Sequence, residues 1–248
     1  MQRHAVVDGI PVVLVAPEMT SPPAPLALWI SHLGGSKEKA RAMLELLAAS
    51  GMTAVSFDPP RHGERATGDT WAFAADTLAA FRARMWPLLG ATTLEALQVL
   101  DWAVAETGAT TVVAGGDSMG GDVAVALAGI DPRVARVAAI GSTPDWARPG
   151  MTVLDDPATV LDQGVPTSYG AWLREQLDPR LHGDRFARDV AIAFECGDDD
   201  RHVPPENAEA FALYLGDRVR VRRHAGLDHL GAIRSTEAHE ACADFLVG

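Results

Sequence analysis

The sequence of 248 residues has little of what marks a disulfide-stapled or membrane-spanning protein. Its two cysteines, Cys196 in an apolar run and Cys242 near the end of the chain, cannot build a disulfide framework. They are expected to be small core residues, with one pairing between them formally open. Asp8 stands where a secretory signal needs its apolar region, and the uncharged stretch 19–36 is broken by prolines. We therefore expect neither a signal nor a membrane span, and the cytoplasm is the simplest compartment.

Positive charge is also scarce. The chain has 21 Lys and Arg against 33 Asp and Glu, a formal net charge of −12. Such a balance repels nucleic-acid phosphates and anionic membranes, so neither is an expected partner. The 48% hydrophobic and 22% charged content is ordinary for a globular protein and excludes disorder. Residues 1–248 are expected to form one domain, with two domains as the fallback and the oligomeric state open.

Short apolar runs rich in Val, Ile and Ala alternate with longer segments of helical periodicity. This order predicts an α/β fold with a mostly parallel central sheet and helices on both faces. Strands are expected at 11–16, 26–31, 53–58, 110–114, 134–140, 190–196 and 219–223. Helices are expected at 37–50, 70–85, 94–106, 119–128, 206–215 and 237–246.

Residues 142–188 interrupt this alternation. They contain five prolines and, among their large rings, two tryptophans and a tyrosine, and helical periodicity appears only around 169–177. A structureless loop of this length is rare in a compact domain, so the segment is predicted to be a short cap. Its rings, Trp146, Tyr169 and Trp172, either anchor the cap or form a wall of a substrate site.

A candidate nucleophile follows the strand expected at 110–114. Gly116-Asp117-Ser118-Met119-Gly120 fits the pattern G-x-S-x-G, in which a sharp strand-to-helix turn raises a serine hydroxyl above the sheet. The alternative is a glycine-rich turn that binds phosphate at a helix N-terminus. No two glycines in the chain stand two apart, which excludes G-x-G-x-x-G, and no Walker lysine follows. Ser118 is therefore the candidate nucleophile.

A base and an acid are expected after later strands. Gly197-Asp198-Asp199-Asp200-Arg201-His202-Val203-Pro204 follows one strand, and Gly226-Leu227-Asp228-His229 follows the last. These segments resemble the α/β-hydrolase family, whose acid loop often reads G-x-x-D-x-x-V-P and whose histidine often sits in G-x-x-H. The resemblance extends over nearly the whole chain and is nearest to small bacterial carboxylesterases and to dienelactone-hydrolase-like and serine-aminopeptidase-like enzymes. It implies a catalytic triad of Ser118, Asp200 and His229.

The same resemblance implies an oxyanion hole made of two backbone N–H groups. Met119, directly after the nucleophile, supplies one. The loop Ser31-His32-Leu33-Gly34-Gly35 supplies the other where similar enzymes read H-G-x-x-G, and this departure favours Leu33 with His32 and Gly34 as alternatives. The segment Asp58-Pro59-Pro60-Arg61-His62-Gly63 resembles the family's D-x-x-x-H-G loop, which implies a structural brace for the rim of the site.

The residues give less support to a metal site. Asp198, Asp200 and His202 suggest a metal site, but no second His or Cys cluster completes a ligand set. No metal or cofactor is therefore expected. The sequence predicts hydrolysis of a small to medium carboxylic ester, with a small-molecule ester as the partner. Amide or peptide hydrolysis is the second hypothesis, and a non-catalytic binding module on the same scaffold is the third.

Overall fold

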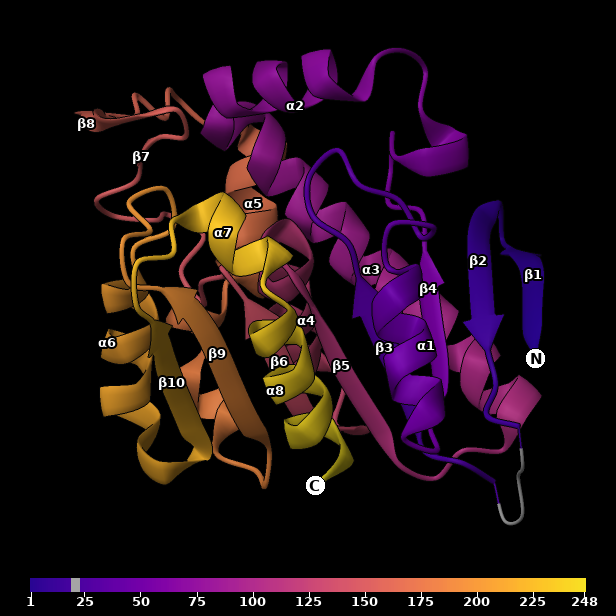
Figure 1. Cartoon of the computed structure of the whole chain (residues 1–248). Helices are drawn as coiled ribbons and strands as arrows, with labels where there is room; N and C mark the ends of the chain where they lie inside the picture. The colour runs from indigo at the N-terminus through magenta and orange to yellow at the C-terminus, as the bar shows by residue number, and fades with distance from the viewer. Residues whose placement is uncertain (19–22) are drawn as a thin grey trace.

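The computed structural model describes residues 1–18 and 23–248. Its main sheet has eight strands in the order β1-β2-β4-β3-β5-β6-β9-β10 (Figure 1). β2 runs antiparallel to its neighbours β1 and β4, and the other neighbouring strands pair in parallel. The strands are β1 (Gln2–Val7), β2 (Ile10–Val15), β3 (Leu26–Ile30), β4 (Thr53–Phe57), β5 (Val112–Asp117), β6 (Val134–Ile140), β9 (Ala191–Gly197) and β10 (Val219–His224).

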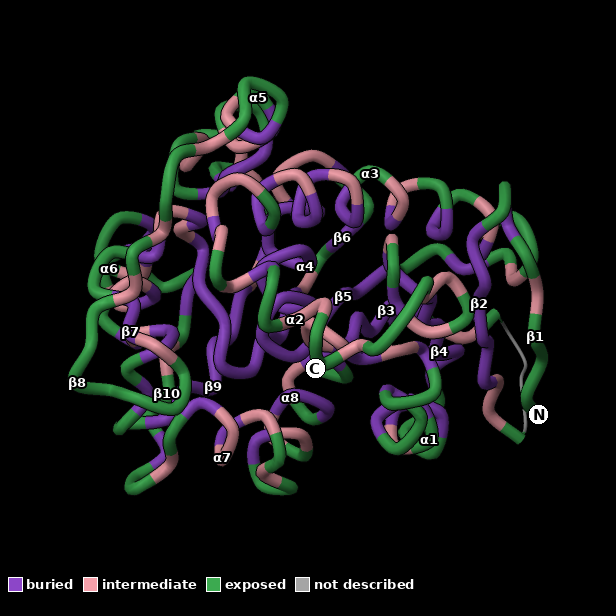
Figure 2. The backbone as a smooth tube through the Cα atoms, turned by 90° about the horizontal axis from the view of Figure 1, so that it is seen from above, coloured by how far each residue is buried: buried purple, intermediate pink, exposed green. Residues whose placement is uncertain are grey.

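Alternate side chains of each central strand enter two separate apolar cores. In β3, Leu28 and Ile30 pack into the core beneath α3 (Phe81–Thr107), α4 (Met119–Ile130) and α6 (Pro205–Leu215). Trp29, between them, joins the opposite core with α1 (Arg41–Ala49) and α8 (Thr236–Val247). This alternation follows from the two-residue period of a strand. Seen from above, the buried strands run between the two helical layers (Figure 2).

The seven strands predicted from sequence are present, with shifts of a few residues at their ends. Strand β1 was not predicted, because most of its side chains are exposed and it lacks an apolar run. A signal for it exists in Asp8-Gly9, which joins β1 to β2 with both residues at positive φ, 49° and 85°. Asx-Gly between two strands is the sequence signature of a two-residue hairpin.

The helices expected at 70–85 and 94–106 are arranged differently. α2 (Thr70–Ala79) is short, and α3 continues from Phe81 through Pro87 to Thr107. The predicted gap between residues 85 and 94 is wrong because tertiary packing favours a continuous helix there. Gly90 faces α5 (Ser168–Leu177), and a Cβ at Gly90 would lie 2.8 Å from Leu173 Cδ1. The glycine permits close approach of two helices.

Residues 142–188 contain more regular structure than the sequence indicated. β7 (Thr152–Val153) and β8 (Asp156–Val160) form an antiparallel pair, followed by α5 and the short 3-10 helices η2 (Pro179–Leu181) and η3 (Gly183–Phe186). Trp86 Nε1–H of α3 donates to the carbonyl oxygen of Trp146 at 2.8 Å, which ties the start of the segment to the core. The remaining helices are α7 (His229–Arg234), η1 (Gly63–Arg65) and η4 (Gly216–Arg218).

No helix in the described part of the chain combines the length and the apolar character needed to cross a membrane. The parallel strands β3, β5, β6 and β9 end at one edge of the sheet, where the loops that carry the predicted site residues begin (Figure 1). In an open α/β sheet this carboxyl edge is the usual place for a ligand site.

Candidate active site

Ser118 stands at the turn between β5 and α4 with φ 49° and ψ −117°. A non-glycine residue in this region costs on the order of 1–3 kcal/mol and persists only where its surroundings hold it. The Ser118 N–H donates to the carbonyl oxygen of Ile140 at 2.8 Å. A Cβ at Gly116 or Gly120 would lie 2.5 or 2.0 Å from the carbonyl oxygen of Ile30. The two flanking glycines therefore let the turn approach β3.

Ser118, His229 and Asp200 form one hydrogen-bonded chain. Ser118 Oγ lies 3.0 Å from His229 Nε2, and His229 Nδ1 lies 2.8 Å from Asp200 Oδ2. All three residues are buried. Because a carboxylate only accepts, Nδ1 carries the proton and Nε2 presents a lone pair to the serine hydroxyl. This is the arrangement a general base needs to take the hydroxyl proton.

Local structure explains why Asp200, of three consecutive aspartates, reaches the histidine. Asp200 is buried, and its Oδ1 accepts the N–H of Val203 at 2.7 Å, which fixes the carboxylate in the turn after β9. Asp198 and Asp199 point outward and are exposed, and Asp198 Oδ1 pairs with Arg223 at 3.1 Å. Across residues 1–18 and 23–248, no group of three His, Cys, Asp or Glu side chains is placed to hold a metal ion.

The two backbone N–H groups predicted to form the oxyanion hole have no acceptor among the described residues. Met119 is the first residue of α4, where an N–H has no partner inside the helix. The N–H of Leu33 likewise donates to nothing among the described residues. The N–H of Gly34 donates to His62 Nε2 at 2.9 Å, so it is already engaged. Of the three residues considered in this loop, Leu33 and His32 retain a free N–H.

The segment from Asp58 to Glu64 holds the loop that carries Leu33. Buried Asp58 accepts hydrogen bonds from the Lys37 N–H at 2.8 Å and from Lys37 Nζ at 2.9 Å. His62 Nδ1–H donates to the Pro60 carbonyl at 2.9 Å, which leaves Nε2 to accept from Gly34. Burial lowers the pKa of His62, in keeping with a neutral ring that accepts at Nε2.

His202 is a neighbour of the site that the sequence reasoning considered only as a metal ligand. Its ring meets that of His229 edge-on, with centroids 5.0 Å apart. His202 Nδ1–H donates to the carbonyl oxygen of Thr152 in β7 at 2.9 Å. Burial, followed by the charges of His229 and Arg148, lowers the pKa of His202 to about 3. A neutral imidazole ring therefore packs against His229. No sequence pattern predicted this contact.

The three aromatic rings of residues 142–188 occupy two kinds of position. Trp146 is fully buried, at 0% exposure, whereas Tyr169 and Trp172 on α5 are 58% and 54% exposed. Among the described residues, no hydrogen bond or ring contact joins these side chains to Ser118, Asp200 or His229. The structure therefore separates Trp146, a core residue, from the other two rings.

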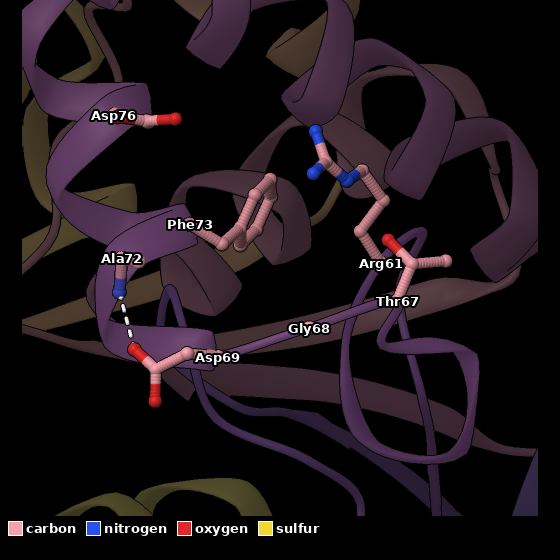
Figure 3. A pocket seen from close by; sticks show the side chains of 7 residues that line it. All are labelled: Arg61, Thr67, Gly68, Asp69, Ala72, Phe73 and Asp76. Atoms are coloured by element: carbon pink, nitrogen blue, oxygen red, sulfur yellow. Dashed lines mark hydrogen bonds between the residues drawn. The ribbon is translucent and has the colours of Figure 1, made fainter.

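A small hollow lies between residues 61–69 and α2. Figure 3 shows Arg61 and Phe73 reaching toward each other beside it, and the Arg61 guanidinium lies 4.5 Å from the centre of the Phe73 ring. The volume of about 200 Å³ is below that of most ligand pockets. α2 packs against the loop that carries Leu33, because a Cβ at Gly34 would lie 3.6 Å from Ala74 Cβ.

Comparison with known proteins identifies the scaffold. No protein-family model and no curated protein sequence matches the chain. TT1662 from Thermus thermophilus superposes with a TM-score of 0.77 at 23% identity, over 99% of this chain and 96% of that one. Est1E from Butyrivibrio proteoclasticus with ferulic acid bound gives 0.68 at 20% identity, over 98% and 97%. The chain has the α/β-hydrolase fold.

This fold confirms the class predicted from the sequence. A puromycin-hydrolyzing peptidase from Mycobacterium tuberculosis also superposes, with a TM-score of 0.71 at 16% identity, over 100% of this chain and 39% of that one. In the α/β-hydrolase fold of this chain, Ser118 follows β5, Asp200 follows β9 and His229 follows β10. Similarity at such identities concerns the fold, so the chemistry is argued from the residues.

Proposed function

We propose that the chain is a serine hydrolase that cleaves small to medium carboxylic esters through an acyl-enzyme. The observation that carries this proposal is the chain of hydrogen bonds from Ser118 Oγ through His229 to Asp200, at 3.0 and 2.8 Å. A serine hydroxyl is a weak nucleophile until a positioned base takes its proton, and an oriented imidazole beside it supplies that base.

Each group then has a defined task. Ser118 Oγ attacks the ester carbonyl carbon while its proton passes to His229 Nε2, and Asp200 stabilises the imidazolium. The N–H groups of Leu33 and Met119 donate to the oxyanion of the tetrahedral intermediate. Collapse of this intermediate expels the alcohol, which takes the proton from His229. Water, activated by the same histidine, hydrolyses the acyl-enzyme and restores Ser118. These steps use no cofactor.

Ester hydrolysis is the first choice of substrate chemistry, and amide hydrolysis is the second. The same triad performs both reactions, because only the leaving group differs. Among similar structures, Est1E holds ferulic acid and another is a peptidase that hydrolyses puromycin. A panel of p-nitrophenyl esters of graded chain length, measured beside the matching anilides, separates the two. Higher kcat/KM on the anilides would contradict the ester assignment.

We also propose that residues 1–248 act as one catalytic domain with residues 142–188 as its cap. Hydrogen bonds between the cap and the acid loop support this view. Thr152 N–H donates to the Arg201 carbonyl at 2.9 Å, and His202 donates to the Thr152 carbonyl. Tyr169 and Trp172 are then the rings available to contact substrate, and Trp146 anchors the cap.

A fluorophosphonate probe tests the catalytic proposal directly. It forms a covalent bond only with a serine activated by a base, so Ser118 of the folded protein should be labelled and Ser118→Ala should not. Ser142, also buried, donates its hydroxyl to the Ser118 carbonyl at 2.8 Å and provides a matched control in Ser142→Ala. Absence of labelling in folded protein would favour a non-catalytic binding module.

A further inference from the structure

A second cavity, of about 470 Å³, lies between α1 and α8 on the side of the sheet opposite α3 and α4. Figure 1 shows α1 and α8 on the same side of the sheet, flanking β3 and β5. Its volume falls in the range of small-molecule sites, about 300–1,000 Å³. Neither Ser118 nor His229 lines it. It is therefore distinct from the proposed catalytic site.

The floor of this cavity carries buried polar groups. Asp117, 7% exposed, accepts the Nε1–H of Trp29 at its Oδ2, at 3.2 Å. Its other oxygen, Oδ1, forms an ion pair with His239 Nε2 at 3.1 Å, which outweighs burial and raises the pKa of His239. His32 also lines the cavity, and burial lowers the pKa of its ring. A carboxylate oxygen and a neutral imidazole thus face the same space.

The rim of the cavity is different in character. Lys39 and Arg234 line it, and neither belongs to an ion pair within the described residues. Two cations therefore stand at one opening of an acidic protein. Glu240 is the single rim anion. Between rim and floor, the walls are apolar, with Met43, Leu46 and Ile233.

We propose that this cavity binds a small hydroxyaryl carboxylate. The phenolic hydroxyl donates to Asp117 Oδ1 on the floor, because a carboxylate oxygen paired with His239 retains a second lone pair. The aromatic ring packs against Met43, Leu46 and Ile233. The carboxylate at the opening is attracted by Lys39 and Arg234, whose combined charge exceeds that of Glu240. The proposal does not depend on the hydrolytic function of Ser118.

Isothermal titration calorimetry of residues 1–248 with para-hydroxyphenylpropanoate tests this site. Phenylpropanoate lacks the hydroxyl and should bind roughly two- to tenfold more weakly, the effect of one hydrogen bond. Tyramine reverses the charge and should bind more weakly still. Failure of para-hydroxyphenylpropanoate to bind, or equal affinity for it and tyramine, would overturn the proposal.

The affinities of variants at the cavity show whether the ligand binds there. Lys39→Met and Arg234→Met should each weaken binding about two- to fivefold, as expected for exposed charges. Arg218→Met on η4 removes another exposed cation that does not line the cavity and should leave the affinity unchanged. Ala42→Phe places a ring at the cavity wall and should abolish binding, whereas Ala105→Phe on the exposed face of α3 should not.

A comparison of binding before and after reaction of Ser118 tests whether the ligand occupies the catalytic site instead. Protein whose Ser118 has reacted with a fluorophosphonate should bind para-hydroxyphenylpropanoate with the affinity of untreated protein. Loss of binding after this reaction, with no effect of Ala42→Phe, would place the ligand beside Ser118 and overturn the proposed site. If Ser118 does not react at all, the proposed function fails, and the binding measured on the cavity variants still decides this proposal.

Discussion

His202 lies edge-on against His229, with ring centroids 5.0 Å apart and planes inclined at 61°. The hydrogen bond from His202 to the Thr152 carbonyl joins this contact to the cap hairpin. One buried ring therefore touches the proposed catalytic base and the proposed cap together. Because burial lowers the pKa of His202 to about 3, the ring stays neutral beside His229 at ordinary pH.

His202 should make the fold sensitive to acid. An unfolded histidine binds a proton near pH 6.5, whereas folded His202 does so only near pH 3. Its contribution to the free energy of unfolding is therefore complete above pH 6.5 and falls by about 1.4 kcal/mol per pH unit as the pH drops toward 3. Urea unfolding at several pH values should show a shallower acid slope for His202→Gln. The exposed residue His4, changed to Gln, is the control, and parallel curves for His202→Gln and wild type would contradict this account.

Ser118→Ala and His229→Ala should each remove nearly all turnover, by on the order of 10⁶ where chemistry limits the rate. The double variant should be scarcely slower than either single variant, because the two residues act in one proton transfer across 3.0 Å. Rates on p-nitrophenyl butyrate, with circular dichroism to confirm folding, provide the measurement. Multiplicative losses would mean that Ser118 and His229 serve different steps.

The three aspartates after β9 give a matched series. Asp200→Asn should lower kcat by about 10⁴, because the amide keeps the shape but no longer selects the Nδ1–H tautomer of His229. Asp199→Asn and Asp198→Asn should change kcat far less, since both residues are exposed and neither forms a hydrogen bond with His229 among the described residues. If Asp199→Asn were the most damaging change, the assignment of the acid would be displaced by one residue.

His62 offers a test of the loop that carries Leu33. His62→Phe keeps a ring against Phe73 but removes the Nε2 acceptor of the Gly34 N–H. We expect kcat to fall roughly 10- to 100-fold with little change in KM, because a small displacement of an oxyanion donor acts on the transition state. His182→Phe, at a partly exposed histidine, is the matched control. A change confined to KM would indicate that the loop binds substrate instead.

The sequence predicted the fold and the three-residue chain because both depend on local patterns. Buried strands appear as apolar runs, and the sharp strand-to-helix turn at Ser118 needs glycines at fixed spacing beside the serine. The contact between Gly90 and Leu173 and the packing of His202 on His229 join residues far apart in the chain. No periodicity encodes such contacts. The continuous α3 and the neutral ring behind His229 therefore became visible only in three dimensions.

The rings of the cap should divide into one that stabilises and two that select substrate. Trp146 has no exposed surface, so Trp146→Ala should lower the free energy of unfolding by about 3–5 kcal/mol, as for other buried aromatic residues. Tyr169→Ala and Trp172→Ala remove rings that are more than half exposed, and both proteins should remain close to wild type in stability. Thermal or urea unfolding of the three variants measures the difference.

Chain-length selectivity then tests the exposed rings. Each methylene placed against an apolar wall contributes at most about 0.8 kcal/mol, up to roughly fourfold in rate. We expect kcat/KM to rise from acetyl to about butyryl or hexanoyl esters and then fall when the pocket is full, with little activity on strongly anionic esters given the net charge of −12. Tyr169→Ala or Trp172→Ala should flatten this profile while fluorophosphonate labelling of Ser118 continues. An unchanged profile in both folded variants would assign these rings to the protein surface and place the selective wall on another element.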